Sequence, residues 1–271
     1  VSVRALNLIS GKSVTIDLNG KTLYCEEEAE ENQIYNFFAV TEEGHLTIKD
    51  SSEDGTGTVE IKNNDADATT VHSLIMCYNG TMTIENGNYK LHYGKNGNGM
   101  IYSQQNKTVT VKGGNFWLGN VGKLENHSPW IFNASGRNGN RIIVNGGTFN
   151  DDVLHQYYAF EVESSEENAL VDNNDGTWSV ITSGAVAHVT ERYVYPANYT
   201  TNYTNTVGYA TLKDAFAAAH TYNYVTEEEM STVTMLKDVT LDAYVTISKS
   251  VNLNLDQFNI TRVDGTALYV N

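Results

Sequence analysis

A short motif recurs along this chain at a nearly constant spacing, and this repeat limits the possible folds more than any other feature. Each copy has a short alternating strand, a turn that carries Gly, one small polar residue and then usually an aromatic residue. Clear copies lie at residues 15–20, 82–89, 109–116, 142–149 and 170–178, and residues 46–59 form the same unit with a longer turn. The anchoring glycines at 20, 57, 87, 114, 147 and 176 are 27 to 37 residues apart, a spacing typical of solenoid repeats.

Apolar runs before the motifs supply a third strand for each repeat. They lie at residues 36–40, 74–77, 100–102, 130–132 and 158–162. Three short strands in roughly 30 residues leave no room for a crossover helix, so we expect parallel pairing between successive coils, about 4.8 Å apart. The residues that follow the turn should then stack as an internal ladder of Leu23, Val59, Tyr89, Phe116, Phe149 and Trp178.

An antiparallel sandwich is the alternative, because Asn-Gly turns also mark hairpins. A sandwich has no reason to repeat an aromatic residue after the same turn at a near-constant period. The sequence therefore favours an all-β fold, a parallel β-helix solenoid with three short strands per coil. Residues 1–182 are predicted to form six coils.

The C-terminal third breaks this pattern. Residues 183–207 are rich in Tyr, Thr and Asn without clear alternation, which predicts a connector. A short helix is expected over 211–220, with Thr211 as its N-cap. Its apolar face would consist of Leu212, Ala215, Phe216 and Ala219.

Residues 249–255 closely repeat the sequence of residues 12–18. We therefore interpret 208–271 as a capping helix followed by the start of a second β-helix-like repeat. A helix placed there would cover the open end of a stack. The alternative is that this segment folds back against the first stack.

Several of these motifs also carry a family resemblance. They are residues 12–23, the Gly-Gly turns at 113–116 and 146–149, and residues 210–215 leading to 236–241. The chain resembles the pectate-lyase-like superfamily of right-handed parallel β-helices, and more closely the repetitive β-helix regions of large bacterial surface proteins. This resemblance implies the handedness of the coils and an extracellular or cell-surface location, but it says little about activity.

Composition excludes several classes of partner. The formal net charge is −16, and such a surface repels nucleic-acid backbones and anionic lipid. The sequence has no signal peptide and no apolar run of about 18 residues, so this segment is not expected to insert into a membrane. Cys25 and Cys77 are interpreted as buried free thiols, with a disulfide as the alternative.

Catalytic motifs of related polysaccharide-cleaving enzymes are incomplete in this chain. Of the hydrolase motifs only Asp151-Asp152 is present, and Trp130-Ile131-Phe132-Asn133 lacks the Asp and His of the similar lyase motif. No catalytic site is predicted. The alternative is a divergent polysaccharide lyase or glycoside hydrolase that uses acidic residues on one face, with Asp151, Asp152 and Asp17 as its candidates.

No metal site is predicted either, because the seven histidines lack zinc-ligand spacing. Two acidic segments, residues 50–55 and 65–67, could bind calcium through oxygen ligands, but neither matches a known calcium loop. The candidate ligands would be Asp50, Glu53, Asp54, Asp65 and Asp67. Solvated turns are the simpler interpretation of both segments.

One position points to binding. If Phe116 faces inward, alternation sends Trp117 outward, between Lys90 and Asn150 of the neighbouring coils. An exposed Trp beside amine and amide groups can serve as a sugar-stacking platform. The alternative is a lone surface aromatic residue that the 119–129 loop covers.

These observations lead to one functional hypothesis. We expect a non-catalytic segment of a large secreted or surface-anchored bacterial protein, which serves as a rigid stalk or scaffold. Its partners would be a glycan or a host or cell-surface protein, and its role adhesion.

Overall fold

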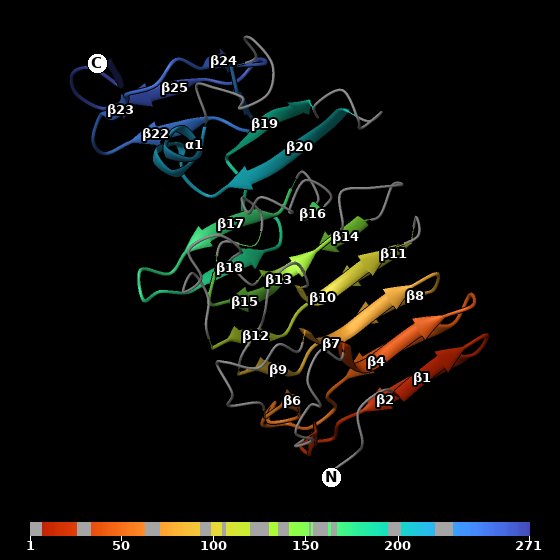
Figure 1. The fold of residues 1–271 in the computed structure, drawn as a ribbon. Helices are drawn as coiled ribbons and strands as arrows, with labels where there is room; N and C mark the ends of the chain where they lie inside the picture. Colours follow the sequence, from red (N-terminus) through yellow and green to blue (C-terminus); the bar gives the residue numbers. More distant parts are fainter. Residues whose placement is uncertain are drawn as a thin grey trace. The chain divides into compact units, whose positions relative to one another are not determined.

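The computed structural model describes residues 7–25, 34–62, 71–92, 99–104, 107–119, 130–134, 141–151, 153, 162–163, 167–194, 202–219 and 230–271. In these ranges the chain forms β-strands and one helix (Figure 1). It divides into two compact units. The first comprises Val1–Val162 with Asp172–Ser179, and the second comprises Glu163–Val171 with Val180–Asn271.

The strands of the first unit recur in groups of three along the chain. The groups are β1 (Asn7–Ser10), β2 (Ser13–Asp17), β3 (Thr22–Cys25); β4 (Ile34–Thr41), β5 (His45–Lys49), β6 (Thr58–Ile61); β7 (Val71–Tyr78), β8 (Thr81–Ile84), β9 (Asn88–Leu91); β10 (Gly99–Gln104), β11 (Thr108–Val111), β12 (Asn115–Leu118); and β13 (Trp130–Asn133), β14 (Arg141–Val144), β15 (Gly147–Phe149). Two more strands follow, β16 (Val162–Glu163) beside β14 and β18 (Trp178–Ile181) beside β15.

Corresponding strands of successive groups pair with one another. The first strands form one sheet in the order β1-β4-β7-β10-β13, and the second strands form another, β2-β5-β8-β11-β14. The third strands, β3, β6, β9, β12 and β15, pair in the same way, and we call them the third sheet. These pairings are parallel, as expected, and Figure 1 shows the successive strands side by side. The sandwich alternative therefore does not hold for these strands.

The inner face of the third sheet carries the predicted ladder. Leu23, Val59, Tyr89, Phe116 and Phe149 are successive register partners. The Phe116 ring stacks between those of Tyr89 and Phe149, with centroids 4.8 and 5.2 Å away. Each aromatic contact of this kind adds about 0.5–1.5 kcal/mol to the effect of burial alone. The ladder is therefore a main element of the core.

The expected sixth rung differs from this pattern. Trp178 is only half-buried. Residues 172–179 form a tight reversal here, and not the Gly turn that joins the second and third strands of the earlier groups. Within this reversal the Asn173 N–H donates to the Thr177 carbonyl oxygen, and the Asp172 and Asp175 carboxylates accept the N–H groups two residues further on. Among the described residues of 1–182, five complete groups of three strands precede this reversal, and the six coils expected over that range stay a prediction.

The second unit begins with strands where a connector was expected. β17 (Ala169–Asp172) pairs in parallel with β20 (Asn202–Tyr209), which pairs antiparallel with β19 (Ala187–Val194). The prediction of a connector over 183–207 is thus corrected. Thr and Tyr favour strands despite their polar groups, and the alternating Ala187 and Val189 are buried.

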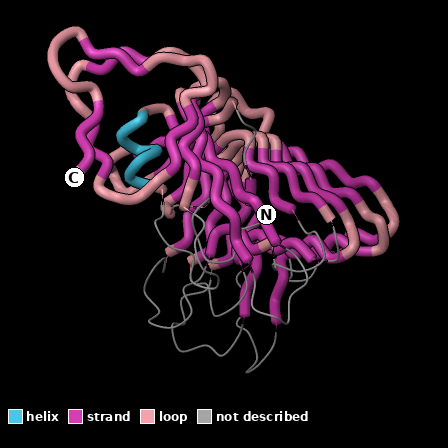
Figure 2. Tube along the Cα trace, turned by 90° about the horizontal axis from the view of Figure 1, so that it is seen from above, coloured by secondary structure: helices cyan, strands magenta, loops and turns pink. Residues whose placement is uncertain are grey.

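The predicted helix is α1 (Leu212–Ala218), capped by the Thr211 side chain, which accepts the Asp214 N–H at 3.1 Å. The expected apolar face, Leu212, Ala215, Phe216 and Ala219, is buried. It packs on β19, β20 and β23, and Figure 2 shows the helix in cyan. No helix in the described part of the chain is long and apolar enough to cross a bilayer.

Two further groups of three strands complete the second unit. They are β21 (Thr232–Met235), β22 (Val239–Leu241), β23 (Val245–Ile247), and β24 (Asn252–Asn254), β25 (Ile260–Arg262), β26 (Leu268–Val270). Corresponding strands again pair in parallel. The turn after β24 repeats the turn after β2, since Asn19 and Asp256 have φ values of 43° and 46°. Their N–H groups donate to the side chains of Asp17 and Asn254 respectively.

Candidate ligand-binding surface

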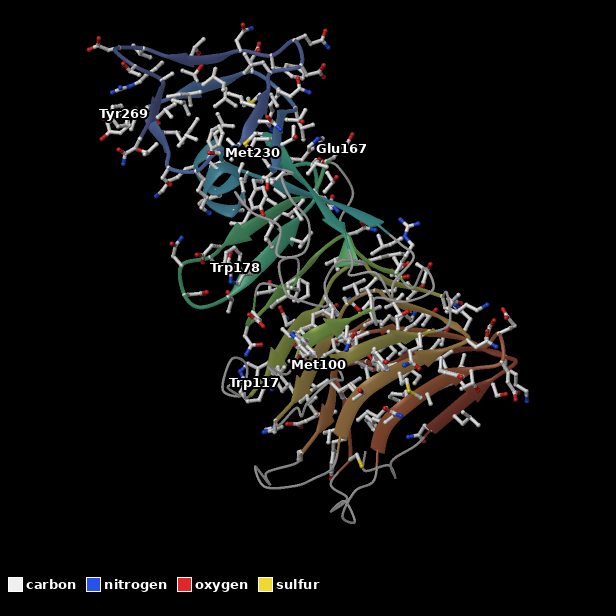
Figure 3. All side chains as sticks on the ribbon, turned by 45° about the horizontal axis from the view of Figure 1, so that its top comes forward. Met100, Trp117, Glu167, Trp178, Met230 and Tyr269 are labelled. Carbon is white, nitrogen blue, oxygen red and sulfur yellow. The ribbon has the colours of Figure 1, made fainter. Side chains whose placement is uncertain are left out.

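The outer face of the third sheet carries one row of side chains in register. Tyr24 pairs with Glu60, Glu60 with Lys90, and Lys90 with Trp117. We call these four residues the Trp117 row. Because Phe116 and Leu118 point inward and are buried, Trp117 points outward, and 42% of it is exposed. Figure 3 labels its side chain.

Neighbouring residues fix the orientation of the Trp117 indole. The His92 ring meets it edge-on, with centroids 5.3 Å apart and planes at 73°. His92 is itself held by Glu60, whose Oε1 lies 2.6 Å from its Nε2. The indole also lies over Gly119, where a Cβ atom would come within 2.8 Å of Trp117 Cη2. Trp117 is therefore a positioned aromatic surface on a rigid strand and not a freely rotating side chain.

Charged and polar groups surround this indole. Lys90 is exposed, and its ammonium forms no hydrogen bond or ion pair with another residue that the structure describes, so this group can donate to a ligand. At the opposite end of the row, the Lys62 ammonium lies 4.2 Å from the centre of the Tyr24 ring. Three strand spacings separate Tyr24 from Trp117, about 14 Å.

Asn150, the third residue of the expected site, has a different role. Its side-chain oxygen accepts the Leu118 N–H, and its side-chain nitrogen donates to the Leu118 carbonyl oxygen, both at 2.9 Å. The amide thus replaces a peptide group and extends the pairing of β15 with β12 by one residue. Asn150 therefore supports the strand that carries Trp117. Its side-chain oxygen and nitrogen are both engaged by the Leu118 backbone and are not directed at a ligand.

Sequence reasoning missed Glu60, His92 and Gly119. Glu60 could have been found, because it occupies the same outward position as Lys90 one repeat earlier. His92 and Gly119 follow Lys90 and Trp117 by two residues, so alternation places them on the same face. What alternation does not predict is that the glycine leaves the space into which the indole fits.

The candidate catalytic carboxylates lie in different groups of strands. Asp17 ends β2 in the first group, and Asp151 follows β15 in the fifth, four strand spacings or about 19 Å further along. Asp152 lies outside the described residues. The Trp130–Asn133 segment is β13, whose four side chains are all buried.

Asp17 serves the turn between two strands. Its carboxylate accepts the N–H groups of Asn19 and Ser51, and Lys49 Nζ lies 3.3 Å from its second oxygen. Desolvation opposes ionisation, but the hydrogen bonds from Ser51, Lys49 and Asn19 outweigh it and hold the pKa of Asp17 below its usual range.

Asp50, a candidate calcium ligand, is buried at a turn. Its carboxylate accepts the N–H groups of Gly20 at 2.9 Å and Gly57 at 2.7 Å, and both oxygens also accept the Ser52 hydroxyl. Burial acts to raise its pKa, yet these hydrogen bonds hold the pKa of Asp50 below its usual range. A Cβ at position 57 would lie 2.4 Å from Asp50 Cγ, so glycine is required there.

The other calcium candidates do not join Asp50 in one cluster. Glu53 is exposed, and Asp54 accepts the hydroxyl of Thr56 at 3.0 Å. Asp65 and Asp67 lie outside the described residues. In the described ranges, no three His, Cys, Asp or Glu side chains gather in a group that could hold a metal ion.

Both cysteines are buried, and they are not joined in a disulfide. Burial raises the pKa of the Cys77 thiol to about 12, and its Sγ donates to the Gly80 carbonyl oxygen at 3.1 Å. A thiol with so high a pKa is protonated at neutral pH and is a poor nucleophile.

Comparisons with protein-family models, with curated proteins and with solved structures find no match to this chain.

Proposed function

We propose that this chain is a non-catalytic scaffold segment of a large secreted or cell-surface bacterial protein, and that it binds a glycan on the outer face of β6, β9 and β12. Its architecture is a right-handed parallel β-helix in this proposal. The parallel pairing of corresponding strands in five successive groups supports that architecture, as does the continuous inner ladder. A stack of this kind is stiff along its axis and suits a stalk that displays a binding surface.

The exposed and fixed indole of Trp117 is the observation that carries the glycan proposal. An indole face stacks on the apolar C–H face of a pyranose ring, and a ring held in place loses little entropy when the sugar binds. His92 and Gly119 provide that fixation. The Lys90 ammonium lies on the neighbouring strand and can donate hydrogen bonds to sugar hydroxyl groups. Binding of host or cell-surface glycans would make the role of the segment adhesive.

A glycan microarray tests this proposal. Wild-type protein is compared with Trp117→Ala and with a matched control, Leu8→Ala, which removes another exposed apolar side chain from the first unit. We expect binding by the wild type and the control, and a loss of about tenfold or more in Trp117→Ala. Equal binding by all three proteins would overturn the proposal.

The same glycans, supplied as polysaccharides, test the catalytic alternative. Incubation with the protein is scored for new reducing ends and for unsaturated products. The proposal predicts neither product. Cleavage that is lost in Asp151→Asn or Asp17→Asn would replace it with a lyase or hydrolase function.

A further inference from the structure

A second aromatic surface lies in the second unit, on residues that the Trp117 site does not include. Among the described residues, Tyr244 and Tyr269 have the most exposed aromatic side chains, at 57% and 54%. Their ring centroids are 6.1 Å apart and their planes are inclined at 59°. Figure 3 labels Tyr269. The two most exposed rings in this part of the chain are thus neighbours.

Strand register explains why the two rings meet. Val245 and Ile247 point inward from β23 and are buried, so Tyr244 and Thr246 point outward. Leu268 pairs with Val245, and Tyr269 pairs with Thr246 on the adjacent strand β26. Tyr269 therefore lies on the same outward face as Tyr244, diagonal to it.

A strand that pairs along the edge of β26 would leave the outward side of this pair open. Strands add to a sheet at its edges, about 4.8 Å away, and leave its faces as they are. Side chains of such a strand would pack beside Tyr269, as Tyr269 packs beside Tyr244, and the face of the sheet would stay uncovered. Val270 is different, because it pairs with the buried Ile247 and so points inward. Its 74% exposure arises because no described residue stacks on this inner position.

The chemistry of this face favours an uncharged ligand. Its outward positions are Thr246 in β23 with Tyr244 and Ser248 on either side of that strand, and Tyr269 in β26 with Ala267 and Asn271 on either side. No charged residue is among them, although the chain carries a net charge of −16. Two inclined aromatic rings offer apolar faces, and the Thr246 and Ser248 hydroxyls can exchange hydrogen bonds with sugar hydroxyls.

We infer that Tyr244 and Tyr269 form a second carbohydrate site, selective for neutral sugars. The tyrosine rings stack on the apolar face of a pyranose, and Thr246 and Ser248 contact its hydroxyl groups. A proline-rich peptide also stacks on aromatic rings, but it docks in a groove between aromatic walls. The short hydroxyl side chains on this sheet face match a sugar better.

The test uses Trp117→Ala protein, so that binding at the first surface is removed. Neutral gluco-, xylo-, manno- and chito-oligosaccharides are titrated by calorimetry, with sialylated and uronic-acid oligosaccharides as the charged set. We expect at least one neutral oligosaccharide to bind, and the further change Tyr269→Ala or Tyr244→Ala to weaken it about fivefold to tenfold. Tyr269→Phe should retain the stacking and most of the affinity.

Val263→Ala is the matched control, since Val263 is 90% exposed in the same unit. It should leave affinity unchanged, and thermal unfolding should show that the tyrosine variants fold normally. The inference fails if Trp117→Ala protein binds no neutral sugar, if the double tyrosine variant binds as its parent does, or if only charged sugars or a proline-rich peptide library bind. None of these results bears on Trp117, whose own test compares wild type with Trp117→Ala.

Discussion

The inner and outer faces of the third sheet come from the same strands and differ in almost every property. On the inner face, Tyr89, Phe116 and Phe149 stack as nearly parallel rings and are almost fully buried. On the outer face, one residue away in the sequence, the Trp117 row mixes aromatic, acidic and basic side chains.

This difference separates stability from recognition. The inner positions repeat one chemistry because each ring packs on the ring of the group before it. The outer positions do not repeat one chemistry: Trp117 meets the His92 ring edge-on, whereas Lys90 on the neighbouring strand is exposed. In β12 the two roles belong to adjacent residues, Phe116 and Trp117. A substitution of Phe116 should lower stability, whereas a substitution of Trp117 should weaken ligand binding.

The largest effect is expected for Phe116→Ala. Removal of a buried ring that contacts Tyr89, Phe149 and Phe132 should lower the free energy of unfolding of the first unit by about 3–5 kcal/mol. Denaturant unfolding measures this value. A loss under about 1 kcal/mol would show that the ladder is not a main element of the core.

A matched pair of leucines sharpens the comparison between covered and uncovered positions. Leu18 and Leu255 occupy the same place in the repeated turn, but Leu18 is 4% exposed and Leu255 is 44% exposed. We expect Leu18→Ala to cost about 2–4 kcal/mol and Leu255→Ala less than about 1 kcal/mol. Equal losses in thermal or denaturant unfolding would contradict the assignment of the two burial states.

The Asp50 carboxylate should make the free energy of unfolding depend on pH in the acidic range. Its pKa is lowered in the folded state, so its contribution is complete above the unfolded value of about 3.9 and is lost as pH falls through the folded pKa. Asp50→Asn should cost about 2 kcal/mol at neutral pH, because amide replaces carboxylate as acceptor for Gly20, Gly57 and Ser52.

Unfolding of both proteins across pH 2–7 checks this prediction. The difference between wild type and Asp50→Asn should shrink once the pH falls below the unfolded value. A constant difference down to the lowest pH would mean that the carboxylate is not held in its charged form.

The sequence predicts the repeated part of this fold well, because its signals are local. Alternation, Gly turns and the residue after each turn place Tyr89, Phe116 and Phe149 in one ladder without knowledge of any long-range contact. Trp117 and Lys90 follow from the same register. The Thr211 cap and the apolar face of α1 are likewise local patterns.

The remaining features depend on contacts between repeats. Asp50 has a carboxylate of the kind that binds metal ions. In the structure this carboxylate instead accepts a hydrogen bond from the N–H of Gly20, 30 residues earlier in the chain. Asn150 similarly acts through the backbone of Leu118, 32 residues away. The strands within 183–207 escape prediction because this segment is rich in Tyr, Thr and Asn without clear alternation. In the folded chain, Ala187 and Val189 of β19 and Val207 and Tyr209 of β20 are buried.

The central claim is that the inner face of the third sheet stabilises the fold and the outer face binds the ligand. The most direct test records the signals of the tryptophan indoles during ligand binding. The chain has three Trp residues, and Trp117 is the exposed one, whereas Trp130 is buried and Trp178 half-buried. Indole N–H signals in a two-dimensional nuclear magnetic resonance spectrum, assigned by single Trp→Phe substitutions, are recorded while the best-binding glycan is added. The account predicts that the Trp117 signal moves to saturation while the Trp130 and Trp178 signals stay in place. A bound glycan that leaves the Trp117 signal unchanged, or moves all three equally, would contradict it.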